Sequence, residues 1–61
     1  MSYVSYVITE TVNGKEVQVW QTYSIQHACA ILCDYTEQDK EDLKPRIYKK
    51  LPNGYLTNEL D

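Results

Sequence analysis

The chain has 61 residues, of which 43% are hydrophobic and 25% are charged, with only two Gly and two Pro. This composition is ordinary for a folded globular domain and excludes a largely disordered chain. The longest apolar run, Ala30-Ile31-Leu32, is far too short to cross a membrane. A chain of this size buries only about 60% of the surface that its unfolded form exposes. We therefore expect one marginally stable domain over residues 1–61, supported by a partner or by a second copy.

Nine acidic and six basic residues give a net charge of −3, and these residues are unevenly distributed. An acidic segment from Asp34 to Asp42 is followed by a basic segment from Lys44 to Lys50. The acidic total disfavours a nucleic-acid backbone as the main partner, because such binding depends on many Lys and Arg side chains. Most charge runs of this kind are solvated faces.

The two cysteines, Cys29 and Cys33, lie four residues apart. Secreted disulfide-rich domains usually carry more cysteines, placed far apart in sequence. The N-terminus also lacks a cationic start followed by an apolar run, so the sequence predicts no secretory signal. We expect reduced thiols in a cytoplasmic protein, where free cysteine usually packs as a small apolar residue.

The sequence predicts a first hairpin over residues 3–23, with Asn13-Gly14 as its two-residue turn. In this register Val12 pairs with Lys15. Apolar and polar side chains then separate onto opposite faces of both strands. The apolar face carries Val4, Tyr6, Ile8, Val17, Val19 and Tyr23, and the polar face carries Ser5, Thr9, Thr11, Glu16, Gln18 and Thr22. Three large residues, Tyr3, Val7 and Trp20, fall on the polar face, with Val7 directly opposite Trp20.

A helix is predicted over residues 25–36, because Ser24 is a good N-cap and apolar residues follow at helical spacing. Its apolar stripe consists of Ile25, Ala28, Cys29, Leu32 and Tyr35. The acidic connection over residues 37–45 is predicted either as helix, with Leu43 in phase with the stripe, or as loop. Pro45 ends any helix before it.

A second hairpin is predicted over residues 46–60, with strands Arg46 to Leu51 and Tyr55 to Leu60. Two registers compete. A two-residue Asn53-Gly54 loop places Ile47, Leu51, Leu56 and Leu60 on one face, although it requires a hydrogen bond from the N–H that Pro52 lacks. A type I turn with Pro52 in its second position suits the proline but separates Ile47 from Leu56. The apolar pattern favours the first register.

The predicted order of strand, strand, helix, strand, strand indicates an α+β fold. The simplest packing is a two-layer ββαββ arrangement, in which one helix covers one face of a four-stranded antiparallel sheet.

Catalytic and metal-binding residue sets are lacking. Around a helix, His27 points about 160° away from Cys29, so one helix cannot bring His27, Cys29 and Cys33 to one metal ion. The same angle excludes a Cys–His catalytic pair. Both glycines lie in predicted turns, so no phosphate-binding loop remains. We expect no enzymatic activity, no metal and no cofactor.

The grouping of Tyr3, Val7 and Trp20 predicts a contact with another protein chain, since Trp and Tyr dominate interface hot spots. We therefore interpret the chain as a non-catalytic protein–protein interaction module that forms a homodimer, either through this face or through an edge strand. A second expected contact is the acidic set Glu37, Asp39, Glu41 and Asp42, which suits a basic groove. In size and acidic composition the chain resembles small phage accessory proteins, which implies an inhibitor that binds a host protein.

The alternative function is binding of single-stranded nucleic acid. Aromatic and basic residues interleave in the second hairpin, as in domains that stack bases on a sheet. The residues concerned are Arg46, Tyr48, Lys49, Lys50 and Tyr55. However, Lys49 and Lys50 point to opposite faces of one strand, and lysines are also common on edge strands as protection against unwanted pairing.

Overall fold

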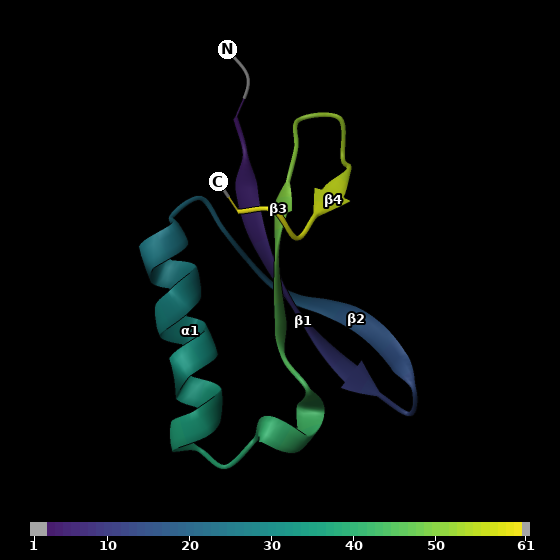
Figure 1. The fold of residues 1–61 in the computed structure, drawn as a ribbon, viewed down its shortest axis with the longest axis vertical. Coiled ribbons are helices and arrows are strands. Elements are labelled where there is room, and N and C mark those ends of the chain that lie inside the picture. Colours follow the sequence, from purple (N-terminus) through teal and green to yellow (C-terminus); the bar gives the residue numbers. More distant parts are fainter. Residues whose placement is uncertain (1–2, 61) are drawn as a thin grey trace.

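The computed structural model describes residues 3–60 and shows a four-stranded antiparallel sheet with one helix packed against it (Figure 1). The spatial order of the strands is β2-β1-β3-β4, so that β2 and β4 form the two edges. The predicted α+β fold class is therefore confirmed. The elements are β1 (Ser5–Val12), β2 (Lys15–Thr22), α1 (Ile25–Glu37), the 3₁₀ turn η1 (Glu41–Leu43), β3 (Arg46–Lys50) and β4 (Leu56–Thr57).

The first turn forms as predicted. Asn13 and Gly14 have φ angles of 54° and 79°, as a type I′ turn requires at both central positions. Val12 consequently pairs with Lys15, and the register continues without change to the pair of Thr9 and Gln18.

The register of the first hairpin then shifts by one residue. Ile8 pairs with Trp20, which leaves Val19 as an extra residue without a partner on β1. This β-bulge turns Trp20 to the sheet face that carries Ile8, which is the face toward α1. The prediction that Trp20 lies opposite Val7 on the other face is wrong, because the extra residue Val19 interrupts the regular alternation of β2. Val7 instead faces Gln21.

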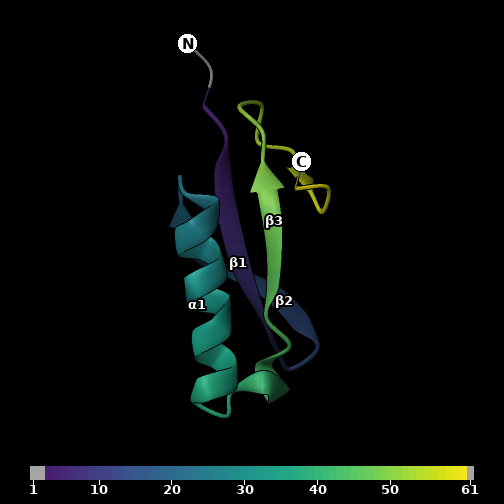
Figure 2. The same cartoon turned by 60° about the vertical axis from the view of Figure 1, so that its left-hand side comes forward.

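The hydrophobic core lies between the sheet and α1, which follows the direction of β1 and β3 (Figure 2). Its buried centre consists of Ile8, Ala28 and Tyr35, surrounded by the half-buried Tyr6, Ile31, Leu32, Leu43 and Ile47. Ser24 is the N-cap of α1, as predicted, and its hydroxyl accepts a hydrogen bond of 3.2 Å from the N–H of His27. The helix continues one residue beyond the predicted end, to Glu37.

The buried stripe of α1 differs from the predicted one at two positions, since Ile25 is only half-buried and outside the core cluster and Cys29 does not belong to it either. Cys29 is exposed, as is Cys33, and both are free thiols. Ile31 packs against the core in place of Cys29, so the stripe consists of Ala28, Ile31, Leu32 and Tyr35. Trp20, which the bulge in β2 turns to the face toward α1, lines one hollow with Ile31.

The connection over residues 37–45 is mostly irregular, with a single 3₁₀ turn at Glu41–Leu43 that brings Leu43 to the core. In the second hairpin, the Gly54 N–H donates to the Leu51 carbonyl over 2.8 Å, and Leu51 pairs with Tyr55. The favoured two-residue loop is therefore wrong, and the type I turn with Pro52 second and Gly54 at a φ of 90° forms instead. The final strand is also shorter than predicted and includes only Leu56–Thr57.

Candidate functional site

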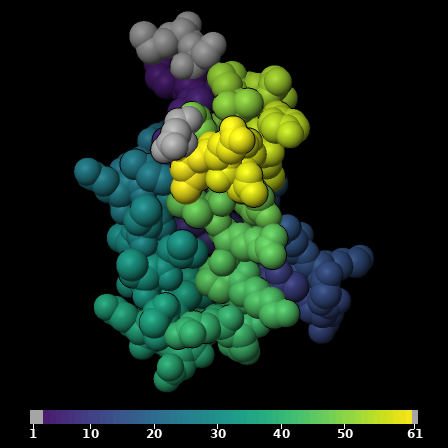
Figure 3. All heavy atoms as spheres, viewed as in Figure 1, coloured from purple at the N-terminus to yellow at the C-terminus, as the bar shows by residue number. Residues whose placement is uncertain are grey.

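The two edges of the sheet differ strongly. β4 has two residues, whereas β2 has eight, and every residue of β2 except Thr22 is exposed. In Figure 3 the residues of β2 (blue) project from one side of the molecule, opposite α1. Natural proteins protect long edge strands with Pro, charge or bulges, because unpaired backbone groups invite another strand. Here β2 contains no Pro, two charged residues at its start, Lys15 and Glu16, and one bulge near its end.

The first turn determines which backbone groups of β2 are unpaired. A two-residue turn makes its flanking pair, Val12 and Lys15, a hydrogen-bonded pair, and the pairs alternate along an antiparallel ladder. The backbone N–H and C=O of Val17 therefore point toward β1. Those of Glu16 and Gln18 point outward, into the space beyond the sheet. We refer to Lys15–Val19 of β2, with these outward groups, as the β2 edge.

The β2 edge and the residue after it carry exposed apolar side chains. Val17 and Val19 are each 41% exposed, and Trp20, next in the strand, is 51% exposed. Val17 pairs with Glu10 and so lies on the sheet face of Ile8, the face that α1 covers further along. The hairpin end of β1 and β2 bends to the side away from α1 in both ribbon views (Figures 1 and 2). Val17 is thus left uncovered where the helix does not reach.

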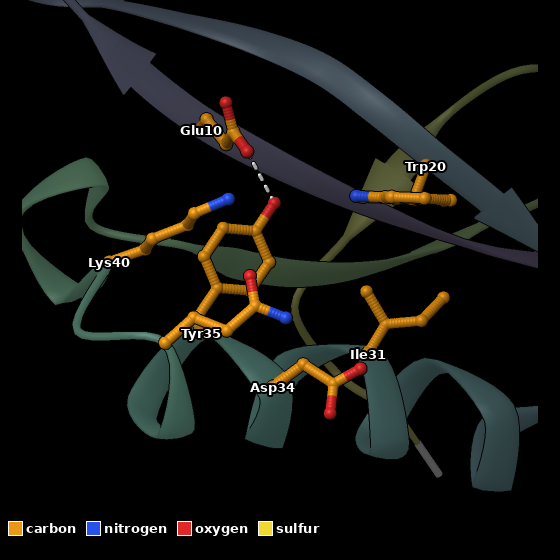
Figure 4. Close-up of a pocket in the computed structure, with 7 residues that line it drawn as sticks. Glu10, Trp20, Ile31, Asp34, Tyr35 and Lys40 are labelled. Atoms are coloured by element: carbon orange, nitrogen blue, oxygen red, sulfur yellow. Dashed lines mark hydrogen bonds between the residues drawn. The ribbon is translucent and has the colours of Figure 1, made fainter.

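A hollow of about 270 Å³ lies between the second half of α1 and the first hairpin (Figure 4). It is lined by Glu10, Trp20, Ile31, Asp34, Tyr35, Gln38 and Lys40. The hydroxyl of Tyr35 donates a hydrogen bond of 2.5 Å to the Glu10 carboxylate, and the indole nitrogen of Trp20 points toward the same hydroxyl. The hydroxyl of Tyr35 and the carboxylate of Glu10 therefore already join α1 to the hairpin.

The electrostatics of Tyr35 match this structural role. Burial raises the pKa of the Tyr35 hydroxyl above its ordinary value of 10.0, and the hydrogen bond to Glu10 raises it further, against a smaller opposite effect of Trp20. A raised pKa keeps the phenol protonated, so that it stays a hydrogen-bond donor. It also makes Tyr35 a poorer source of phenolate, which does not suit general-base or nucleophilic chemistry.

The face of the sheet away from α1, which we call the far face, carries a second polar cluster. Glu16 Oε2 accepts hydrogen bonds from the Tyr48 hydroxyl and from Thr9 Oγ1, each over 2.7 Å. The Tyr48 bond, followed by the Thr9 bond, lowers the pKa of Glu16 below its ordinary value of 4.5. Because β1 lies between β2 and β3, the side chain of Tyr48 must cross β1 to reach Glu16.

The passage of the Tyr48 side chain across β1 is consistent with the burial of Val7, its partner on that strand. Val7 pairs with Tyr48 on β3 and with Gln21 on β2, and only 1% of its surface is exposed. It lies on the far face, whereas Trp20 lies on the face toward α1. The predicted patch of Tyr3, Val7 and Trp20 therefore does not form, although Tyr3 and Trp20 are individually exposed.

The four residues of the predicted acidic set lie between the C-terminal end of α1 and the start of η1. Glu37 ends the helix, Asp39 follows it in a left-handed conformation, and Glu41 and Asp42 begin η1. All four carboxylates are on exposed residues. These four residues lie at the end of α1 and in η1 and are not part of the β2 edge.

The predicted nucleic-acid residues do not share one surface. Arg46, Tyr48 and Lys50 pair with far-face residues of β1, whereas Lys49 lies on the opposite face. The Tyr48 hydroxyl is bound to Glu16, so a carboxylate lies among these cations. Tyr55 is exposed, and with Lys49 it lines a shallow hollow near the C-terminal end of the described chain.

The sequence pattern places Val17 and Val19 on the face under the helix and does not indicate that they are exposed at the β2 edge. The Asn-Gly turn identified the hairpin, but no signal in the sequence showed that β2 is an outer strand.

Within residues 3–60, no three His, Cys, Asp or Glu side chains are grouped closely enough to hold a metal ion, and no helix has the length and apolar character needed to cross a membrane. No protein-family model, curated protein or solved structure is significantly similar to this chain.

Proposed function

We propose that this protein is a non-catalytic protein-binding module that associates through the β2 edge and acts as a homodimer. The observation that carries the proposal is an eight-residue edge strand with outward backbone groups and exposed valines. Addition of a strand to such an edge is a common mode of protein recognition, in which backbone hydrogen bonds give affinity and neighbouring side chains give specificity.

The marginal size of the domain supports association. A domain of this length has little apolar burial in reserve, and a second chain on the β2 edge would cover Val17 and Val19. The opposite edge offers much less, because β4 has two residues and the turn before it contains Pro52.

The acidic set of Glu37, Asp39, Glu41 and Asp42 supplies a second surface in this proposal, for a basic partner such as a host protein bound by a phage-type inhibitor. Its exposed carboxylates are the supporting observation. Reversal of charge at Glu41 and Asp42 should then abolish capture of that partner, and salt should weaken it steeply. Self-association through β2 should not respond to these two substitutions.

The first experiment is the solution mass, measured by light scattering on a sizing column over a concentration series. We expect the mass to rise to twice the chain mass. The variant Gln18→Pro should remain monomeric, because it removes an outward N–H and places a ring on the edge. It should also remain folded, since proline is tolerated where a strand N–H faces away from the sheet.

Val12→Ser is the matched control, because Val12 is exposed in the same hairpin but lies on β1. Its self-association should equal that of the wild type. A wild-type monomer at every concentration, or a folded Gln18→Pro variant that still dimerises, would overturn the proposal.

A further inference from the structure

We infer that the occupant of the β2 edge is a second β2, antiparallel to the first, with a two-fold axis at Val17. In this arrangement Glu16 of each copy lies opposite Gln18 of the other. The inference rests on the proposed function, and it adds a register that can be tested separately from association itself.

Within the β2 edge, Lys15–Val19, backbone geometry restricts the symmetric antiparallel registers to three. A ladder hydrogen bond between two edges forms only where both residues direct their N–H and C=O outward. Before the bulge these residues are Glu16 and Gln18, by the alternation that starts at the Val12–Lys15 pair. A symmetric antiparallel pair can therefore place Glu16 opposite Glu16, Glu16 opposite Gln18, or Gln18 opposite Gln18.

The opposed charges and the number of hydrogen-bonded residue pairs distinguish the three registers. Glu16 opposite Glu16 brings two carboxylates together, which is destabilising for directly opposed like charges. Gln18 opposite Gln18 places Glu16 opposite Trp20, and Trp20 directs its backbone toward Ile8 of β1, so that only one bonded pair forms. Glu16 opposite Gln18 gives two bonded pairs, related by the two-fold axis, and opposes no like charges.

The side chains agree with the selected register. Both observed hydrogen bonds to Glu16 end on Oε2, and the amide of Gln18 from the second copy is a suitable further donor to the carboxylate. Val17 meets its own symmetry mate on the face toward α1. Lys15 lies opposite Val19, where the bulge ends the regular seam. The β2 edge has one Lys and one Glu, so it is neutral although the chain carries −3.

Disulfide trapping tests the register. Cys29 and Cys33 are exposed and are first replaced by Ser, to give a background without native thiols. Val17→Cys is then introduced. Val17 forms a non-hydrogen-bonded pair with its mate, in which the Cα atoms lie about 4.5 Å apart, within the range of about 4.4–6.8 Å that disulfides accept. We expect mild oxidation to convert most of this variant to a covalent dimer on a non-reducing gel.

Val19→Cys in the same background is the matched control, because Val17 and Val19 are equally exposed at 41%. In the inferred register the two Val19 positions are separated by four residues, or roughly 13 Å at about 3.3 Å per residue. We expect at least a tenfold lower yield of covalent dimer for this variant. Addition of Gln18→Pro to Val17→Cys should remove the crosslink.

The possible results distinguish the two proposals. A dimer by light scattering without preferential crosslinking of Val17→Cys would overturn the register alone. A higher yield from Val19→Cys than from Val17→Cys would do the same. A monomeric mass for the wild type, together with no crosslink in either variant, would overturn both the register and the proposed function.

Discussion

The Tyr35 hydroxyl donates a hydrogen bond of 2.5 Å to the Glu10 carboxylate and so connects the last turns of α1 to the first hairpin. Tyr35 belongs to the buried core through its ring, while its hydroxyl reaches the hollow beside Trp20 (Figure 4). The helix packs on the sheet mainly through small and aliphatic side chains. This polar contact therefore joins the last turns of the helix to one position on the hairpin.

Replacement of Tyr35 by Phe should destabilise the fold by about 1.5 kcal/mol, the lower end of the range for a hydrogen bond to a charged group, because the half-buried Glu10 can regain water. Urea unfolding followed by circular dichroism would measure the change. Tyr23→Phe is the control. Tyr23 is 73% exposed, so its variant should stay within about 0.5 kcal/mol of the wild type. Equal stabilities of the two variants would show that the contact with Glu10 contributes nothing.

The raised pKa of Tyr35 also predicts a loss of stability in alkali. The unfolded chain releases the phenolic proton near its ordinary pKa of 10.0, while the folded chain retains it to higher pH. The contribution of Tyr35 is therefore complete below pH 10.0 and is lost as the pH rises toward the folded pKa. Unfolding free energies of wild type and Tyr35→Phe should converge as the pH rises above 10.0. Parallel curves would contradict the shift, since other tyrosines and lysines titrate in both proteins.

Much of the fold follows from turn and cap signals that act locally. Asn13-Gly14 defines the first turn because both positions need positive φ, and Ser24 defines the helix start because its hydroxyl satisfies the N–H of His27. Such signals depend on neighbours in sequence. The order of strands in the sheet does not, and the position of β2 at an edge became evident only from the structure.

The bulge at Val19 shows why the candidate site was harder to predict. Regular alternation placed Trp20 beside Val7 on one face, and a single unpaired residue separates them onto two faces. Val7 is then covered by a hydroxyl-bearing side chain that reaches across from β3 to Glu16. Neither event leaves a mark in the apolar pattern, because Val, Trp and Tyr all suit strands on either face.

The far-face cluster predicts a loss of stability in acid. The hydrogen bonds from Tyr48 and then Thr9 lower the folded pKa of Glu16 below 4.5. Its contribution is therefore present above pH 4.5 and is lost as the pH falls through the folded value. Glu16→Gln should flatten the acid side of the stability curve, measured by thermal unfolding from pH 6 to pH 2.5 at a concentration where the chain is monomeric. Tyr48→Phe should flatten it in part, because it removes the first of the two bonds.

Glu37→Gln is the control for this measurement, since Glu37 is an exposed carboxylate at the end of α1. Its acid limb should follow that of the wild type. A Glu16→Gln curve that keeps the full wild-type slope below pH 4.5 would show that the two hydroxyls do not favour the ionised carboxylate.

In the second hairpin, one substitution should raise or lower the stability of the fold depending on the register of the two strands. In the observed type I turn, Pro52 occupies the second position, where its fixed φ is already suitable, and the Gly54 N–H closes the turn onto Leu51. Pro52→Ala should then destabilise the fold by roughly 0.4–1 kcal/mol, because the unfolded chain gains freedom. In the two-residue register the same change would restore a missing N–H and stabilise the hairpin. Thermal unfolding of Pro52→Ala decides between them, and a rise in melting temperature would contradict the observed turn.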